Sequence, residues 1–182
     1  MRRSAAETFG LDPEELDDRH HLTFDTYEQG RLSLDEYLER TVFFRERAFS
    51  REEFKRFMFS QSRAQAEMIQ LVTGLKERHR LKVAAVSNEG RELTLHRIRT
   101  FSLANFVDCF VCSCFVHCRK PDKEIFRMAL DLIQASSAES VYIDDRELFT
   151  EVARELGIRS IHYTSCESTR SQLSALGLSR PE

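Results

Sequence analysis

The chain has 182 residues, 41% of them hydrophobic, which is enough to bury the core of one domain or of one domain with a sizeable insertion. Charged residues make up 31% and nearly balance, at a formal net charge of -3, which argues against a basic footprint for nucleic acid or for an anionic membrane surface. The basic first residues are not followed by the apolar core of a targeting peptide, and no apolar run approaches membrane-spanning length, so we expect a cytoplasmic protein.

The first part of the chain, to about Arg80, is predicted to be all helix. Three helices are expected where a capping side chain stands three residues before a Glu, at Asp12-Pro13-Glu14-Glu15, Ser33-Leu34-Asp35-Glu36 and Ser50-Arg51-Glu52-Glu53. A fourth is expected over residues 64–78, where Met68, Leu71, Val72 and Leu75 form one apolar stripe. Several phenylalanines between positions 43 and 59 predict that this region packs a small core of its own.

From Leu81 onward the hydrophobic period changes and strands alternate with helices. Strands are predicted at 81–86, 106–114, 140–143 and 158–163, and helices at 92–101, 122–134, 146–156 and 168–176. Gly157 and Gly177 are expected to end the last two helices in the left-handed conformation. Such alternation predicts an α/β fold, with a doubly wound parallel sheet covered by helices.

Polar residues follow three of these strands. Ser87 and Asn88 follow the first, Lys120 stands before the helix that follows the second, and Asp144 and Asp145 follow the third. The carboxyl ends of parallel strands form the edge where open sheets build ligand crevices. A hydroxyl, an ammonium group and two carboxylates near a helix N-terminus make a suitable site for a phosphoryl group and Mg²⁺.

Each signal alone is common, because Ser-Asn, Lys-Pro-Asp and Asp-Asp are ordinary caps and turns. Taken in order, however, they resemble the haloacid dehalogenase-like hydrolase superfamily, in its subgroup with an α-helical cap inserted between the first and second motifs. VAAVSNEG is similar to the second motif, RKPDKEIF to the third and VYIDDRELFTEVARELGI to the fourth, while DTYEQGRLSLDEYL looks like part of the cap. The resemblance implies a cap over residues 1–80 and a Rossmann-like core, strands two to five, over residues 81–182.

The resemblance also implies roles for individual residues. Ser87 would donate a hydrogen bond to the transferring phosphoryl group, supported by the backbone around Asn88. Lys120 would neutralise charge on that group and on the nucleophile. Asp145 aligns with the Mg²⁺ ligand, and Asp144 would orient Lys120 or metal-bound water. The implied activity is a Mg²⁺-dependent phosphatase acting on a small phosphorylated metabolite, with haloacid dehalogenation as an alternative.

The first motif of the family has no counterpart in this chain. Its nucleophile is an Asp at the end of an apolar first strand, usually followed two residues later by Asp or Gly, and the sequence contains no Asp-x-Asp. Asp25 lies in a helical segment with no apolar strand before it. Residues 1–7 look like the segment that follows the first motif, so the chain is expected to begin after it. Without the nucleophile no acyl-phosphate can form.

Two consequences follow from that absence. The chain is either an N-terminally shortened hydrolase or an inactive family member that binds a phosphate ligand or a protein partner. In the family the first strand lies between the strand that ends at Ser87 and the strand that ends at Asp144. We therefore expect these two strands either to pair directly or to leave exposed edges in a poorly folding chain.

Two further clusters have competing interpretations. Four of the five cysteines lie in the ten residues from Cys109 to Cys118, with His117 among them, which offers enough ligands for zinc. Because Cys112 and Cys114 are expected on one face of a strand, we favour reduced, structural thiols. His20 and His21 in the cap could contact substrate or could be solvated helix residues.

Overall fold

The computed structural model describes residues 2–179, which group into two compact units. The first, here called the helical unit, consists of residues up to Arg63 together with Asn88–Ser102 and Cys112–His117. The second, here called the α/β unit, consists of Ala64–Ser87, Leu103–Val111 and the residues from Cys118 onward. This grouping crosses the boundary at residues 80 and 81 several times, and the division into cap and core stays a prediction.

The helical unit contains α1 (Arg2–Phe9), α2 (Pro13–His21), α3 (Phe24–Glu28), α4 (Leu34–Thr41), α5 (Arg51–Ser60), α7 (Arg91–Thr100) and α8 (Ser113–Val116). The predicted start signals are confirmed. Ser33 and Ser50 form complete capping boxes with Glu36 and Glu53, and Asp12 accepts hydrogen bonds from the first turn of α2. Local side-chain chemistry therefore sets where these helices begin.

An aromatic core holds the helical unit together, as the phenylalanine pattern predicted. The ring of Phe9 lies 4.5 Å from that of Phe49, 5.0 Å from that of Phe54 and 5.3 Å from that of Phe57. Leu38 is fully buried in the same cluster. Aromatic pairs at these separations stabilise a core beyond the area that they bury.

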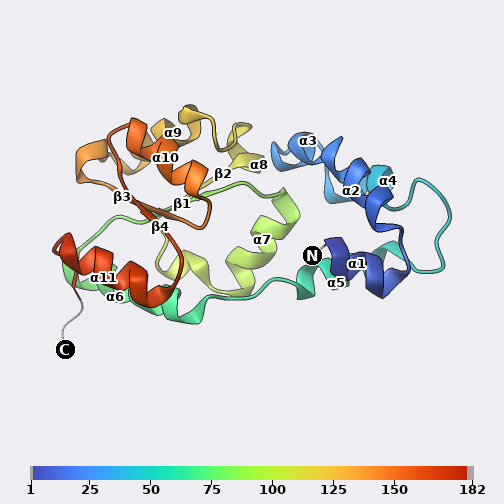
Figure 1. Ribbon diagram of the computed structural model, residues 1–182, viewed down its shortest axis with the longest axis horizontal. Helices are drawn as coiled ribbons and strands as arrows, with labels where there is room; N and C mark the ends of the chain where they lie inside the picture. The colour runs from blue at the N-terminus through green and yellow to red at the C-terminus, as the bar shows by residue number, and fades with distance from the viewer. Residues whose placement is uncertain (1, 180–182) are drawn as a thin grey trace. The chain divides into compact units, whose positions relative to one another are not determined.

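The α/β unit contains α6 (Ala66–His79), β1 (Ala84–Ser87), β2 (Cys109–Cys112), α9 (Lys123–Ile133), β3 (Val141–Asp144), α10 (Glu147–Glu155), β4 (Arg159–His162) and α11 (Cys166–Ala175), with 3₁₀ turns at Leu103–Asn105 and Ser137–Glu139 (Figure 1). β3 and β4 are parallel, with Ile143 opposite Ile161. Gly157 and Gly177 have φ values of 80° and 83°, as expected for residues that end helices. The α/β fold class is confirmed.

Helices cover both faces of the β3–β4 pair (Figure 1). Val141 and Ile143 pack against a buried cluster that includes Leu71 and Leu75 of α6 and Leu173 of α11. Tyr142 and Asp144 must point to the opposite face, because side chains alternate along a strand. On that face Tyr142 meets Phe126 of α9, with ring centroids 5.1 Å apart. The alternation therefore separates an apolar face from a face that carries polar groups.

The strands form two pairs, β1 with β2 and β3 with β4, and no ladder joins β1 to β3 within residues 2–179. Direct pairing of these two strands, one of the two expected outcomes, is therefore not found. Every residue of β1 and β3 is only partly buried, whereas strands inside a doubly wound sheet are normally covered on both faces. β1 and β3 therefore each keep one unpaired edge and side chains that are only partly covered.

One predicted strand is shorter than expected. β2 ends at Cys112, and the chain then forms α8, so Cys114 lies on a helix and not on the strand face that was predicted for it. The Ser113 hydroxyl donates a hydrogen bond to the carbonyl oxygen of Glu28 (2.6 Å) and accepts one from the amide of Glu89 (3.1 Å). These tertiary bonds override the local strand preference, a common outcome for short apolar segments.

Candidate functional site

Lys120 is the most deeply buried cation of the predicted site. It stands two residues before Asp122, whose side chain caps α9 by accepting from the Glu124 amide, so Pro121 precedes the cap and does not itself open the helix. Only 6% of Lys120 is exposed. Its Nζ lies 4.8 Å from the centre of the Phe149 ring on α10 and 5.7 Å from that of Tyr142. A charge so withdrawn from water needs a close partner.

Asp144, at the carboxyl end of β3, is that partner. Lys120 Nζ lies 2.6 Å from Asp144 Oδ2, and the Tyr142 hydroxyl donates a short hydrogen bond to the same oxygen. Asp144 Oδ1 accepts from the amide of Arg146 at 2.8 Å, which shapes the turn into α10. Burial alone would raise the pKa of Asp144, but the hydrogen bonds from Lys120 and Tyr142 outweigh it and hold the pKa below its usual value. Asp144 is therefore a carboxylate whose two oxygens are both engaged.

Tyr142 is a site residue that the sequence analysis did not single out. Its hydroxyl lies 3.0 Å from Lys120 Nζ and contacts Asp144. Burial, followed by the hydrogen bond to Asp144, raises the pKa of Tyr142 well above the usual range of a phenol. The strand alternation, which puts residues 142 and 144 on one face, was the signal that could have identified it.

Asp145 and Ser87 have different surroundings. Asp145 is exposed, and in the described part of the chain its carboxylate makes no hydrogen bond or ion pair, while its carbonyl oxygen lies 3.1 Å from Nε2 of His162. Ser87 is half-buried at the carboxyl end of β1 and likewise has no side-chain partner between residues 2 and 179. Ser87, Lys120 and Asp144 all belong to the α/β unit. Within that unit, α9 packs against both β1 and α10. Asn88 follows Ser87 in the chain and groups with the helical unit.

The two neighbouring carboxylates differ in their fitness for Mg²⁺. Mg²⁺ prefers oxygen ligands and often uses only one or two protein carboxylates, keeping waters and taking substrate phosphate oxygens. Asp145 fits that pattern because its carboxylate is exposed and unengaged, whereas both Asp144 oxygens already accept hydrogen bonds. Among the described residues no three His, Cys, Asp or Glu side chains gather into a metal-binding group. Asp145 is thus the better ligand, and a role for Asp144 at the metal stays a prediction.

The other two sequence clusters lie outside this arrangement. All five cysteines are free thiols, and burial raises the pKa values of Cys114 and Cys118. Nδ1 of His20 lies 2.8 Å from the Tyr37 hydroxyl, and its ring stacks on Phe24. His21 is exposed beside Asp17. Substrate contact by either histidine stays a prediction.

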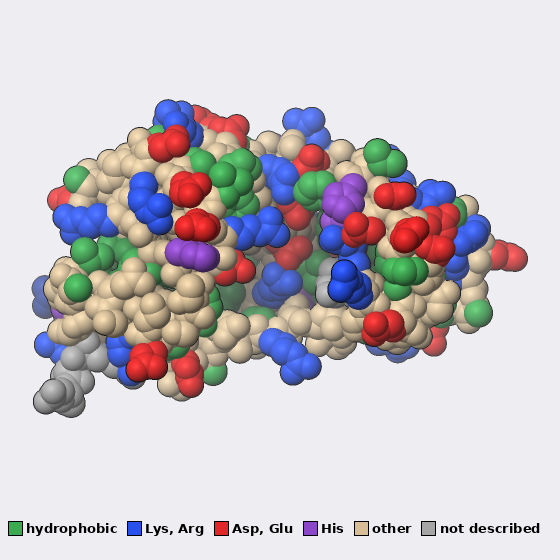
Figure 2. All heavy atoms as spheres, in the orientation of Figure 1, with side chains coloured by type: hydrophobic (Ala, Val, Ile, Leu, Met, Phe, Trp, Pro, Cys, Tyr) green, Lys and Arg blue, Asp and Glu red, His purple; other side chains and the backbone are tan. Residues whose placement is uncertain are grey.

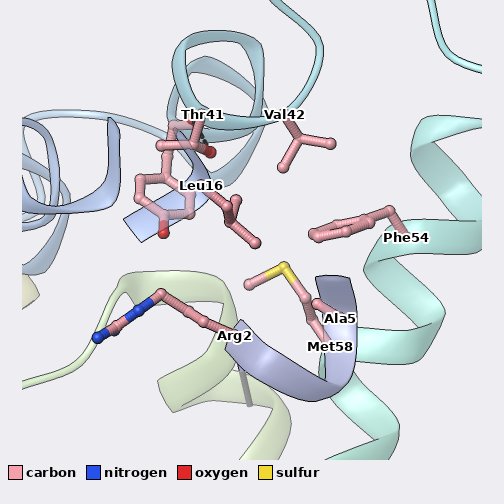
Figure 3. Close-up of a pocket in the computed structure, with 8 residues that line it drawn as sticks. Arg2, Ala5, Leu16, Thr41, Val42, Phe54 and Met58 are labelled. Atoms are coloured by element: carbon pink, nitrogen blue, oxygen red, sulfur yellow. Dashed lines mark hydrogen bonds between the residues drawn. The ribbon is translucent and has the colours of Figure 1, made fainter. Parts of the chain in front are cut away.

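The helical unit has a small, mainly apolar cavity, with room for about 20 Å³ (Figure 3). Its lining residues are Arg2, Ala5, Leu16, Tyr37, Thr41, Val42, Phe54 and Met58. That volume suits about one water molecule and no metabolite.

Over the face seen in Figure 2, acidic and basic side chains are interspersed. No helix in the described part of the chain has the length and apolar character needed to cross a membrane.

Residues 6–163 match the family described as haloacid dehalogenase-like hydrolase. Among curated proteins, the chain is 28% identical over 76 residues to flavin mononucleotide hydrolase 1 of Arabidopsis thaliana, a match that covers 42% of this chain and 31% of that protein. The aligned part is therefore less than a third of that relative's length.

Solved structures with the same fold include a predicted HAD-like family hydrolase from Porphyromonas gingivalis, with a TM-score of 0.71 and 19% identity over 91% of this chain and 90% of that one. Another is a mutant HAD family enzyme from Bacteroides thetaiotaomicron, in complex with magnesium and inorganic phosphate. Its TM-score is 0.64 at 21% identity, and the match covers 83% of this chain and 86% of that one. These likenesses support a Rossmann-like core of the kind found in that group.

Proposed function

Because the chain belongs to the haloacid dehalogenase-like hydrolase family, we propose that its α/β unit binds the phosphoryl group of a small phosphorylated metabolite, as the substrate-binding part of a Mg²⁺-dependent phosphatase site. The observation that carries the proposal is the buried Lys120 ammonium, fixed at 2.6 Å from Asp144 at the carboxyl end of a parallel strand. Phosphoryl transfer depends mainly on positioning and charge compensation, which such a cation provides.

Each residue has a separate part in this proposal. The hydroxyl of Ser87, which has no side-chain partner among the described residues, donates a hydrogen bond to a phosphoryl oxygen, and Lys120 offsets the negative charge. Asp144 orients Lys120. Asp145 holds Mg²⁺, which when bound would neutralise further charge on the phosphate oxygens. The Bacteroides enzyme that was solved with magnesium and inorganic phosphate supports this pairing of ligands.

Binding a phosphoryl group and hydrolysing it require different residues. The residues of the α/β unit compensate charge, but the sequence has no Asp-x-Asp to serve as the family's nucleophile. A second candidate is a family member that binds a phosphorylated ligand without hydrolysing it. Haloacid dehalogenation, a third candidate, needs the same nucleophile as the phosphatase.

The test measures binding and catalysis on the same protein. Inorganic phosphate is titrated by calorimetry with and without Mg²⁺, and turnover of an aryl phosphate and of flavin mononucleotide is followed in parallel. We expect phosphate binding that Mg²⁺ strengthens, and no chelator-sensitive turnover above background. Lack of phosphate binding in the millimolar range would refute the proposal. Turnover that chelation abolishes would show that another group supplies the nucleophile.

Asp145→Asn tests the metal assignment. Removing one carboxylate oxygen from the ion should weaken Mg²⁺ binding about tenfold or more, with the melting temperature unchanged because Asp145 is exposed. Glu147→Gln, which neutralises an exposed carboxylate two residues away in the first turn of α10, is the matched control and should bind Mg²⁺ as the parent does. Equal Mg²⁺ affinity in Asp145→Asn would remove that residue from the site.

The proposal includes a cytoplasmic protein with a small-molecule partner. Five free thiols are consistent with a reducing compartment. A metabolite panel is the way to identify the substrate.

A further inference from the structure

Three polar groups of the α/β unit meet in one closed triangle. Lys120 Nζ lies 2.6 Å from Asp144 Oδ2 and 3.0 Å from the Tyr142 hydroxyl, and that hydroxyl donates to the same Asp144 oxygen. The side chains of Lys120 and Asp144 are only 7% and 8% exposed. Because water has little access, these contacts decide how the ammonium group is held.

The phenolic oxygen is not needed for packing or for charge balance. The Tyr142 ring makes its edge-to-face contact with Phe126 through carbon atoms, which a phenylalanine would reproduce. The Asp144 carboxylate already supplies a negative charge for Lys120. The hydroxyl is therefore an additional polar group brought into a buried position, where it would be destabilising if it lacked partners. What it adds is a second fixed point for the ammonium group.

A second fixed point matters because of the chemistry of lysine. Its ammonium group rotates freely on a flexible four-carbon stem, and one ion pair leaves that rotation open. The Asp144 carboxylate and the Tyr142 oxygen both accept from this ammonium group, and because the two oxygens are hydrogen-bonded to each other they hold it from one side. The centre of the Phe149 ring lies 4.8 Å from the same Nζ.

We infer that Tyr142 is a positioning residue of the phosphoryl site, whose hydroxyl locks the Lys120 ammonium group and the Asp144 carboxylate into one orientation. This inference rests on the proposed function for its purpose, since the locked ammonium group is the one assigned to the phosphoryl oxygens. The lock itself is a property of the free protein and can be measured without a ligand.

Tyr142→Phe removes the oxygen and keeps the ring. The first readout is the exchange of lysine ammonium protons with water, followed in ¹H–¹⁵N spectra, with the Lys120 signal identified by its absence in Lys120→Arg. We expect the Lys120 protons to exchange about tenfold faster or more in Tyr142→Phe, the factor for losing one hydrogen bond of about 1.4 kcal/mol. Lys76, which has the partners Asp108 and the Phe106 carbonyl in the same unit, is the internal control.

The outcomes separate a positioning role from a structural one. Faster exchange at Lys120 with Lys76 unchanged supports the inference. Equal acceleration at both lysines would mean that Tyr142 only stabilises the unit, and unchanged exchange at Lys120, or no resolved Lys120 signal in the parent protein, would likewise overturn it. Tyr163→Phe, at a half-buried tyrosine just after β4, should leave both signals as they are.

The second readout is the dissociation constant for inorganic phosphate. We expect Tyr142→Phe to weaken phosphate binding about tenfold while Mg²⁺ affinity is kept, and Tyr163→Phe to bind like the parent. If the parent binds phosphate and Tyr142→Phe binds it equally well, the positioning role is refuted and the proposed function stands. If the parent binds no phosphate, the proposed function fails, and the proton exchange still decides whether Tyr142 locks Lys120.

Discussion

The two units of this protein are stabilised in contrasting ways. The helical unit encloses a cluster of aromatic and aliphatic side chains, with capped helices around it and surface ion pairs such as that of Arg45 with Glu15. The α/β unit keeps β1 and β3 half-exposed and buries an ion pair beside the end of β3. A buried charge pair contributes little net stability compared with apolar packing, so its presence points to a chemical purpose. The helical unit therefore relies on packing, whereas the α/β unit holds the buried polar groups to which the proposal assigns anion binding.

The largest effect should come from breaking the buried pair. Lys120→Ala leaves the Asp144 carboxylate uncompensated, and we expect a loss of about 3–5 kcal/mol in the free energy of unfolding together with the loss of phosphate binding. The matched control is Lys76→Ala, which breaks a more exposed pair with Asp108 in the same unit and should cost below about 1 kcal/mol. Urea denaturation measures both. If the free energy of unfolding fell equally in the two variants, the Lys120–Asp144 pair would contribute no more than an exposed ion pair does.

The next effect concerns the packed core of the helical unit. Leu38→Ala removes a fully buried side chain and should lower the free energy of unfolding by about 2–5 kcal/mol. Leu22→Ala makes the same change at a side chain that is 86% exposed and should alter it by no more than about 0.5 kcal/mol. Phosphate affinity of the folded protein should be the same in both variants. A change in that affinity for Leu38→Ala would contradict the division of roles between the units.

A smaller effect is expected at the helix caps. Ser50→Ala removes the hydroxyl that accepts from the Glu53 amide and should cost about 1 kcal/mol in the helical unit. Ser60→Ala, at the exposed last residue of the same helix, serves as the control, since its hydroxyl donates back to the Phe57 carbonyl, accepts a long hydrogen bond from the Gln61 side chain and caps no helix N-terminus. Thermal melts compare the two. Equal melting temperatures would mean that the capping box adds nothing to the stability of α5.

The last effect, which is absent at neutral pH, is a pH dependence in the helical unit. Burial, reinforced by Arg2 and His21 and partly offset by Asp17, lowers the pKa of His20 to about 4. The unfolded chain therefore takes up this proton first as the pH falls, so the stabilisation is complete above pH about 6.5 and is lost as the pH falls from there toward 4. Melting temperatures should decline between pH 7 and pH 5, and His20→Gln should flatten that slope. An identical slope in the variant would exclude His20 as its cause.

Local signals predicted much of the fold. Capping boxes join residues three apart, and the switch from helical to alternating periodicity falls within a few residues, so the sequence alone was enough to predict where α4, α5 and the β–α alternation begin. The strand-end positions of Ser87, Lys120, Asp144 and Asp145 could also be predicted from this alternation.

Tertiary structure decided the features that depend on distant partners. Ser113 is helical because of the Glu28 carbonyl, 85 residues away in sequence. Asp144 and Asp145 are adjacent and chemically identical, yet Lys120, 24 residues before Asp144 in the sequence, pairs with the first, while the second stays exposed. The contact between the Tyr142 hydroxyl and Lys120 likewise forms only once α9, α10 and β3 have packed. Composition and period determine which elements form, whereas the state of a buried polar group is set by neighbours that the chain brings together only on folding.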